Sequence, residues 1–95
     1  MQFAKPLRDR IRTGEIKCSV RIWRSPRVKL GGLYRMGEGH VRVDSIKPID
    51  ITDITGELAR RSGFQGVVDL LKMARHGSGT NVYLIEFTYI DRDDR

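Results

Sequence analysis

The stretch that decides the fold is Ile16-Lys17-Cys18-Ser19-Val20-Arg21-Ile22-Trp23. Its even-numbered positions are apolar, and its odd-numbered positions are polar or, at Trp23, amphipathic. Because side chains alternate between the two faces of a strand, this pattern predicts a strand over 16–23 with one face toward a core. Proline cannot donate a hydrogen bond to a neighbouring strand, so Ser25-Pro26 is predicted to end it.

A short helix is predicted on the N-terminal side of this strand, over 6–12. Pro6 suits the first turn of a helix, and Leu7 and Ile11 share one face because they are four residues apart. Thr13-Gly14 then provides a helix stop. The other positions are mostly arginine, so this helix is expected to form only by docking on the rest of the domain.

Two more strands are predicted on the C-terminal side. Residues 28–30 fit either a short strand or a loop, and an extended pattern resumes from Leu33 to Met36. Gly37-Glu38-Gly39 indicates a hairpin turn. The following strand begins near Val41 and is predicted to run to Ile46, ahead of Pro48.

The second half of the chain changes from strand period to helical period. A short helix is predicted near Thr55 and is closed by Gly63. A longer helix is introduced by the capping box Ser62-Gly63-Phe64-Gln65 and is predicted to end near His76, with Gly77 as its stop. Its core-facing stripe consists of Phe64, Val67, Leu71 and Ala74. Val82 to Ile90 is apolar on both faces, which predicts a central strand.

The order of these elements predicts an α+β fold, because the strands dominate and the helices are grouped rather than alternating with strands. A small twisted sheet or partly closed barrel with helices at its ends fits best. The 95 residues are expected to form one domain, with an ordered core over about 3–90 and a frayed tail over 91–95.

The charge of the chain is concentrated in its first half. The whole sequence carries +6 and has a pI near 10. Residues 1–47 hold twelve basic and four acidic side chains, a net charge of +8, whereas residues 48–95 carry −2. No apolar run approaches the roughly 20 residues that span a bilayer, and no secretory segment follows the first methionine. A single cysteine cannot form an internal disulfide, which predicts a cytoplasmic protein. One cysteine and two histidines argue against a structural zinc site. We also expect a monomer that has no cofactor and makes no membrane contact.

The most basic stretch extends from Lys17 to Arg35. It contains no acidic residue and includes two aromatic side chains, Trp23 and Tyr34. Basic groups pair with phosphates, and an aromatic face can stack on an unpaired base, so nucleic acid is the favoured partner. The alternative is a solvated arginine-rich strand in which Trp23 closes one end of the core. The positive side chains are Lys17, Arg21, Arg24, Arg27, Lys29 and Arg35.

Other groups carry weaker indications of chemistry. Lys17 and Ser19 share a predicted face, where a lysine of lowered pKa could activate a hydroxyl. Gly77-Ser78-Gly79 follows a helix rather than preceding one, which favours a helix stop over a phosphate loop. Cys18 is expected in the core, and Asp44 and Glu86 are expected to form ion pairs with Arg21 or Arg42.

The segment Gly14-Glu15-Ile16-Lys17-Cys18-Ser19-Val20-Arg21 resembles the Gly-x-Lys-x-x-Thr-x-Arg signature of ASCH domains, in the PUA-like superfamily. Three further stretches resemble that family in the same order, so that the resemblance covers about Phe3 to Ile90. They are Arg24-Ser25-Pro26-Arg27-Val28-Lys29-Leu30-Gly31, the helix pair Ile54-Thr55-Gly56-Glu57-Leu58-Ala59-Arg60-Arg61-Ser62-Gly63-Phe64, and the closing strand Val82-Tyr83-Leu84-Ile85-Glu86-Phe87.

This resemblance implies a PUA-like β-barrel of about five or six strands, with helices at its ends and a cleft beside the signature strand. PUA-like domains generally bind RNA or modified nucleobases, and some ASCH proteins are ribonucleases or N4-acetylcytidine amidohydrolases. Ser19 falls at the signature threonine and Arg21 at the arginine, whereas the lysine position holds Ile16 and Lys17 is one residue late. The glutamate of the amidohydrolase branch falls near Gly63 and is unmatched.

The sequence therefore predicts a module that binds RNA or a modified nucleobase in a basic cleft beside the 16–23 strand. The alternative is a small hydrolase that acts on an acylated nucleoside or on RNA, with Lys17 and Ser19 as catalytic residues. A third possibility is a module for a small molecule or protein partner in the same cleft. The predicted binding residues are Lys17, Ser19, Arg21, Trp23, Arg24, Arg27, Lys29 and Arg35.

Overall fold

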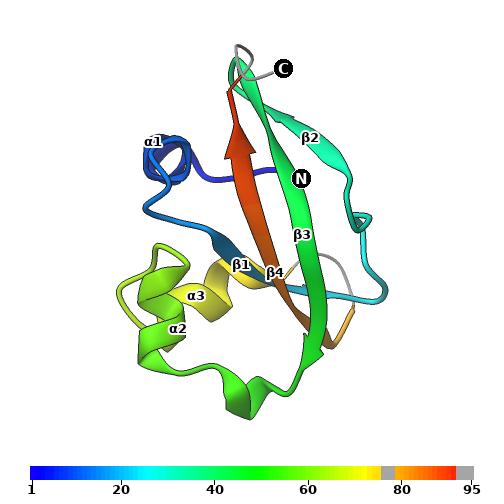
Figure 1. Cartoon of the computed structure of the whole chain (residues 1–95). Helices are drawn as coiled ribbons and strands as arrows, with labels where there is room; N and C mark the ends of the chain where they lie inside the picture. The colour runs from blue at the N-terminus through cyan, green and yellow to red at the C-terminus, as the bar shows by residue number, and fades with distance from the viewer. Residues whose placement is uncertain (76–78, 92–95) are drawn as a thin grey trace.

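The computed structural model describes residues 1–75 and 79–91, which form an α+β fold. Figure 1 shows a long curled sheet with α1 beside its upper part and α2 and α3 together beside its lower part. None of the described helices is long and apolar enough to cross a membrane. In chain order the elements are α1 (Lys5–Arg12), β1 (Cys18–Trp23), β2 (Leu33–Met36), β3 (Gly39–Ile49), a 3-10 turn (Ile51–Asp53), α2 (Gly56–Arg61), α3 (Val67–Ala74) and β4 (Asn81–Ile90).

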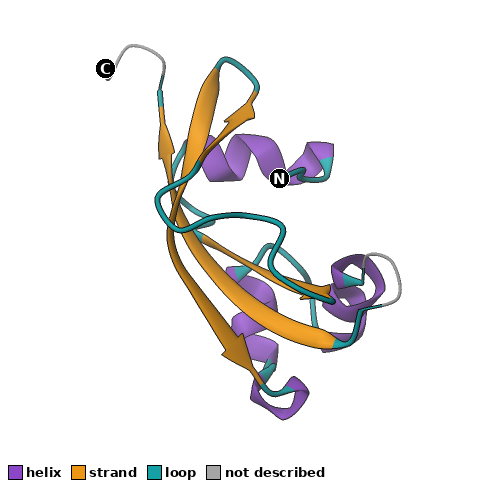
Figure 2. Cartoon of the chain, turned by 90° about the vertical axis from the view of Figure 1, so that its right-hand side faces the viewer, coloured by secondary structure: helices purple, strands orange, loops and turns teal. Residues whose placement is uncertain are grey.

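The four strands join one antiparallel sheet in the order β1-β4-β3-β2, and Figure 2 shows how strongly it curls. The predicted α+β class is confirmed, and so is the central position of the last strand, because β4 lies between β1 and β3. The resemblance led us to expect a barrel of five or six strands. The described residues form four, so a closed barrel is not confirmed.

A β-bulge interrupts β3 in its middle. Val43 lies opposite Phe87 and Ser45 lies opposite Glu86, so Asp44 is an extra residue with no partner position on β4. An extra residue reverses the alternation of side chains beyond it and bends the strand. Ile46 therefore faces the same side of the sheet as Val43, although it lies three positions further along the chain.

The sheet has a hydrophobic core on each face. The α1-side core contains α1 and the N-terminal residues, and the α2/α3-side core contains the two later helices. Strand β1 contributes to both, and all six of its residues are buried. The α1-side core is built from Phe3, Ile11, Ile16, Trp23, Val28, Met36, Val41, Val43, Ile85 and Phe87, and the α2/α3-side core from Cys18, Val20, Ile22, Ile54, Leu58, Ala59, Leu70, Ala74 and Val82.

Two predicted strand boundaries need correction. The strand predicted to stop at Ile46 continues through Pro48 to Ile49. Strand β2 pairs only with residues 39–42 of β3, so Pro48 lies where β3 is a sheet edge, and an edge tolerates a missing backbone donor. The 16–23 strand begins two residues late, at Cys18, and residues 28–30 belong to a loop.

The predicted capping box at Ser62 is also wrong. Ser62 ends α2, and its hydroxyl donates a hydrogen bond to the carbonyl of Leu58 (2.9 Å). Gly63 has a φ of +94°, and the next amide, that of Phe64, donates back to the carbonyl of Ala59 (2.9 Å). This is the hydrogen-bond pattern that closes a helix, so Gly63 is confirmed as the stop of α2, and α3 begins only at Val67.

The Asp44 carboxylate lies at the bulge and should make the free energy of unfolding depend on pH in the acid range. Thr88 Oγ1 donates to it (2.5 Å) and Arg42 Nε contacts it (2.9 Å); these bonds, that of Thr88 above all, hold the pKa of Asp44 below its ordinary value. A depressed folded-state pKa stabilises the fold above the unfolded value of about 4, and this contribution disappears as the pH falls through the folded value.

We therefore expect Asp44→Asn to lower the free energy of unfolding at pH 7 and to have little effect near pH 2. Urea unfolding of both proteins at the two pH values measures this. Glu38→Gln, at the exposed hairpin turn, is the control and should change neither value. An equal loss at both pH values would contradict the assignment.

Candidate functional site

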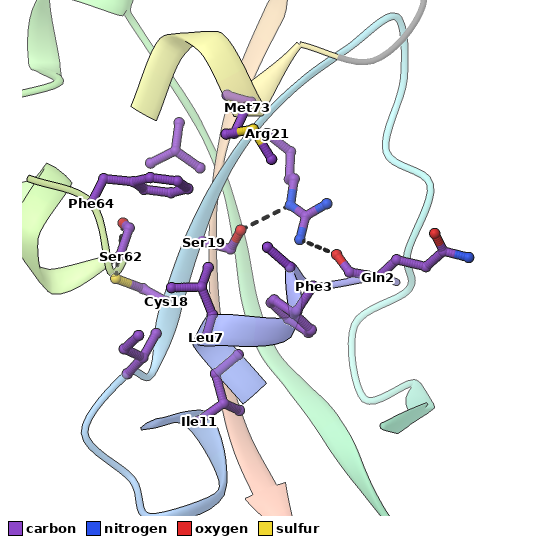
Figure 3. A pocket seen from close by; sticks show the side chains of 14 residues that line it. Gln2, Phe3, Leu7, Ile11, Cys18, Ser19, Arg21, Ser62, Phe64 and Met73 are labelled. Atoms are coloured by element: carbon purple, nitrogen blue, oxygen red, sulfur yellow. Dashed lines mark hydrogen bonds between the residues drawn. The ribbon is translucent and has the colours of Figure 1, made fainter. Parts of the chain in front are cut away.

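A pocket of about 260 Å³ lies along the outer side of β1 (Figure 3). It is bounded by the N-terminal residues and α1, by Ile16 and β1, and by the end of α2 and the C-terminal end of α3. Most of its lining is apolar. The lining residues are Gln2, Phe3, Ala4, Leu7, Ile11, Ile16, Cys18, Ser19, Val20, Arg21, Ser62, Phe64, Met73 and Ala74.

Arg21 is the charged side chain among the described residues that line this pocket. Its side chain is 9% exposed, and burial lowers the pKa of its guanidinium below the ordinary value. Arg21 Nε donates to the Ser19 hydroxyl (2.8 Å), and Nη2 donates to the carbonyl of Gln2 (2.6 Å), as Figure 3 shows. The guanidinium also lies over the Phe3 ring, 5.2 Å from its centre. These contacts hold the guanidinium at the wall of the pocket.

The structure separates the predicted pair Lys17 and Ser19. Ser19 is buried in the pocket wall, and its oxygen accepts the hydrogen bond from Arg21. Lys17 is exposed and does not belong to the lining. The described lining contains no lysine, histidine or carboxylate that could act as a general base for Ser19. This arrangement is suited to holding a ligand.

Trp23 lies outside the pocket. It is 3% exposed, belongs to the α1-side core and packs against Tyr83, with 6.2 Å between the ring centres. This placement corresponds to the alternative interpretation, in which Trp23 closes one end of the core. The indole is therefore covered by protein on both faces and offers no surface for stacking.

The remaining predicted cations are exposed around the loop that follows β1. Arg24, Arg27 and Lys29 lie on this loop and Arg35 lies on β2. The loop packs over the α1-side core through Val28, and Figure 2 shows it crossing the sheet. Among residues 1–75 and 79–91, the ion pairs are Arg10–Glu15, Arg12–Asp9, Arg42–Asp44 and Lys47–Glu86, so none of these four cations has an acidic partner there.

Several pocket residues escaped the sequence analysis. Gln2 contributes a backbone carbonyl, which no side-chain pattern reveals. Phe64 and Ala74 were assigned to a core-facing helix stripe, yet both line the pocket. Met73 is a large apolar side chain that is 53% exposed at the pocket, and this exposure becomes visible only in the structure.

The other groups singled out in the sequence have structural roles. Cys18 is buried as expected, with Sγ 3.6 Å from the Ser62 hydroxyl. The expected ion pair of Asp44 is made with Arg42, and Glu86 pairs with Lys47 instead of an arginine (3.5 Å). His76, Gly77 and Ser78, and most of the predicted tail, lie outside the described residues.

Within the described residues, histidine, cysteine and acidic side chains do not gather into a group that could hold a metal ion. The pocket offers a ligand one guanidinium, hydroxyls, backbone groups and apolar walls. Comparison of the chain with protein-family models, with curated proteins and with solved structures finds no match, so a function for this protein has to be inferred from the geometry of the pocket and the charges around it.

Proposed function

We propose that this protein binds single-stranded RNA by taking one unpaired base into the pocket beside β1. The observation that carries the proposal is the pocket itself, which has apolar walls on two sides and the fixed Arg21–Ser19 pair on a third. Concave sites with apolar walls and a few oriented polar groups are the usual form of small-ligand sites.

The size of the pocket favours a base over a larger ligand. Its volume of about 260 Å³ lies below the range of roughly 300–1,000 Å³ that is typical of drug-sized ligands. A single planar ring system fits such a space. The aromatic side chains of Phe3 and Phe64 line it, and aromatic groups stack on any base regardless of its sequence.

The charges outside the pocket support a nucleic-acid partner. Arg24, Arg27, Lys29 and Arg35 are exposed, and none is neutralised by an acidic side chain of the described residues. Cations of this kind bind phosphates and release counterions from the nucleic acid. The sugar–phosphate backbone would follow the loop while one base enters the pocket.

The resemblance to ASCH domains points in the same direction, because Ser19 and Arg21 stand at signature positions and both line the pocket. A closed PUA-like barrel and a cytoplasmic, monomeric state are further parts of this proposal. Binding is favoured over hydrolysis since the described lining lacks a general base.

The test is the salt dependence of binding to a short fluorescent oligouridylate. Four phosphate contacts predict a slope of about −3 for the logarithm of the binding constant against that of the salt concentration, because a single strand loses about 0.7 per contact. Absence of binding at low salt, or an affinity that does not change with salt, would refute the proposal.

A charge-matched pair of variants locates the phosphate contacts. Arg27→Ala with Lys29→Ala should reduce the magnitude of the slope by about 1.4. Arg60→Ala with Arg61→Ala removes the same charge from exposed positions on α2 and should leave the slope unchanged. Equal effects of the two pairs would show that only net charge matters and would contradict a specific surface.

A further inference from the structure

The backbone of β1 has one edge that pairs with none of the other strands in residues 1–75 and 79–91. β1 is the outermost strand of the sheet, next to β4. The carbonyl of Lys17 accepts a hydrogen bond from the amide of Phe87 (2.9 Å), which places the odd-numbered residues in hydrogen-bonded pairs with β4. In an antiparallel ladder such pairs alternate along the strand. The amide and carbonyl groups of Cys18, Val20 and Ile22 therefore point away from the sheet.

The partner of Ile22 confirms this direction. Ile22 forms an isolated parallel bridge with Arg75, just after α3, on the side of β1 opposite β4. Cys18 and Val20 lie further along the same edge. No loop or side-chain hydrogen bond among residues 1–75 and 79–91 reaches their backbone groups.

This unpaired edge is buried and faces the pocket. Cys18 and Val20 are each 2% exposed, and both line the pocket. Buried backbone amides and carbonyls almost always have hydrogen-bond partners in native structures. The pocket thus presents two amides and two carbonyls in alternation, a wall that matches a ligand with a donor and an acceptor side by side.

The side chains around this edge complete the recognition of a flat ring. Phe3 and Leu7 pack with the α1-side core, and Phe64 and Ala74 belong to the α2/α3-side core, so they lie on opposite sides of the sheet plane. A ring that pairs edge-on with β1 is coplanar with the strand, and its two faces meet these two groups of side chains.

We infer that the pocket holds its base through the hydrogen-bonding edge of the base, paired with the backbone of Cys18 and Val20 as an additional strand would be. This inference rests on the proposed RNA binding and specifies the ligand further. The base must have an adjacent ring donor and acceptor that are free, so the pocket accepts only unpaired bases and rejects those alkylated on that edge.

The test compares oligouridylates that carry a methyl group at different ring positions. One probe has 3-methyluridine, in which the methyl group replaces the edge donor, and its matched control has 5-methyluridine, in which the methyl group lies away from that edge. We expect 3-methyluridine throughout the strand to weaken binding by at least about tenfold. The 5-methyl probe should bind within about twofold of the unmodified strand.

The two failures are distinguishable. If the unmodified strand binds with the expected salt slope but both methylated probes bind equally well, RNA binding stands and edge recognition is refuted. If no probe binds, the proposed function itself fails. Amide hydrogen exchange provides an independent readout. The oligouridylate should slow exchange of the Val20 amide but leave that of the Ser19 amide unchanged, because Ser19 is already paired with β4. Unaltered exchange at Val20 would overturn the inference.

Discussion

Phe87→Ala is expected to lower the free energy of unfolding by about 3–5 kcal/mol, the usual loss when a buried aromatic ring is truncated. Phe87 is 1% exposed on the central strand β4, and its ring centre lies 5.3 Å from that of Phe3. Truncation removes a buried ring and leaves a cavity between β3 and the N-terminal residues. The total free energy of unfolding of a small domain is about 5–15 kcal/mol, so this loss is a large fraction of the total.

Urea unfolding followed by fluorescence or circular dichroism measures this effect, which corresponds to a midpoint lower by roughly 2 M. Phe87→Leu retains most of the apolar volume and should lose less, which keeps the prediction testable if the alanine variant does not fold. Val68→Ala is the control, because Val68 is exposed on α3 and its truncation should cost less than about 0.5 kcal/mol. A loss below about 1 kcal/mol for Phe87→Ala would contradict the central position of this ring.

Ala74→Leu is expected to abolish RNA binding while the protein remains folded. Ala74 lies at the end of α3, is buried and lines the pocket. A leucine at this position would occupy the space proposed for the base. Because the added carbons enter a pocket instead of a filled core, the stability cost should stay at or below the roughly 1–3 kcal/mol of an overpacked site. We expect affinity for oligouridylate to fall by at least about a hundredfold, from base stacking and hydrogen bonds lost together.

Met73→Trp provides a second obstruction at a side chain that is already half exposed, so folding should be little affected. Circular dichroism and thermal unfolding establish that each variant is folded before titration. Val68→Leu, on the same helix but outside the pocket, is the matched control and should bind as the unmodified protein does. Folded obstructed variants that bind RNA normally would place the base elsewhere.

The sequence predicts where the strands of this fold lie better than it predicts which of their side chains are buried. Alternation over 16–23 and the apolar faces of 82–90 correctly identified β1 and the central β4. The same alternation places Ser19 and Arg21 on the polar face of the strand, away from the apolar core, yet both are buried. The reason is non-local: the N-terminal residues and α1 cover that side, and nothing within the strand encodes a cover supplied by a distant segment.

The candidate site shows the same division. Arg21 and Ser19 were predicted from charge and strand period, and both line the pocket. Trp23 follows the same period but lies at the end of the strand, where Tyr83 covers it. Whether a given position on a strand meets solvent, a pocket or a core depends on which helix packs over it, and the periodicity of the strand is identical in all three cases.

Because of the bulge at Asp44, the number of residues in β3 can change without changing which residues of β3 and β4 lie opposite each other. The positions on either side of Asp44 already have consecutive partners on β4, Phe87 and Glu86. A shorter homologue without this residue would align every later side chain with the same neighbour and would differ only in the curvature of the sheet. One inserted residue of this kind can bend an otherwise flat pair of strands. In the sequence the insertion is marked by the spacing of the apolar residues Val41, Val43 and Ile46.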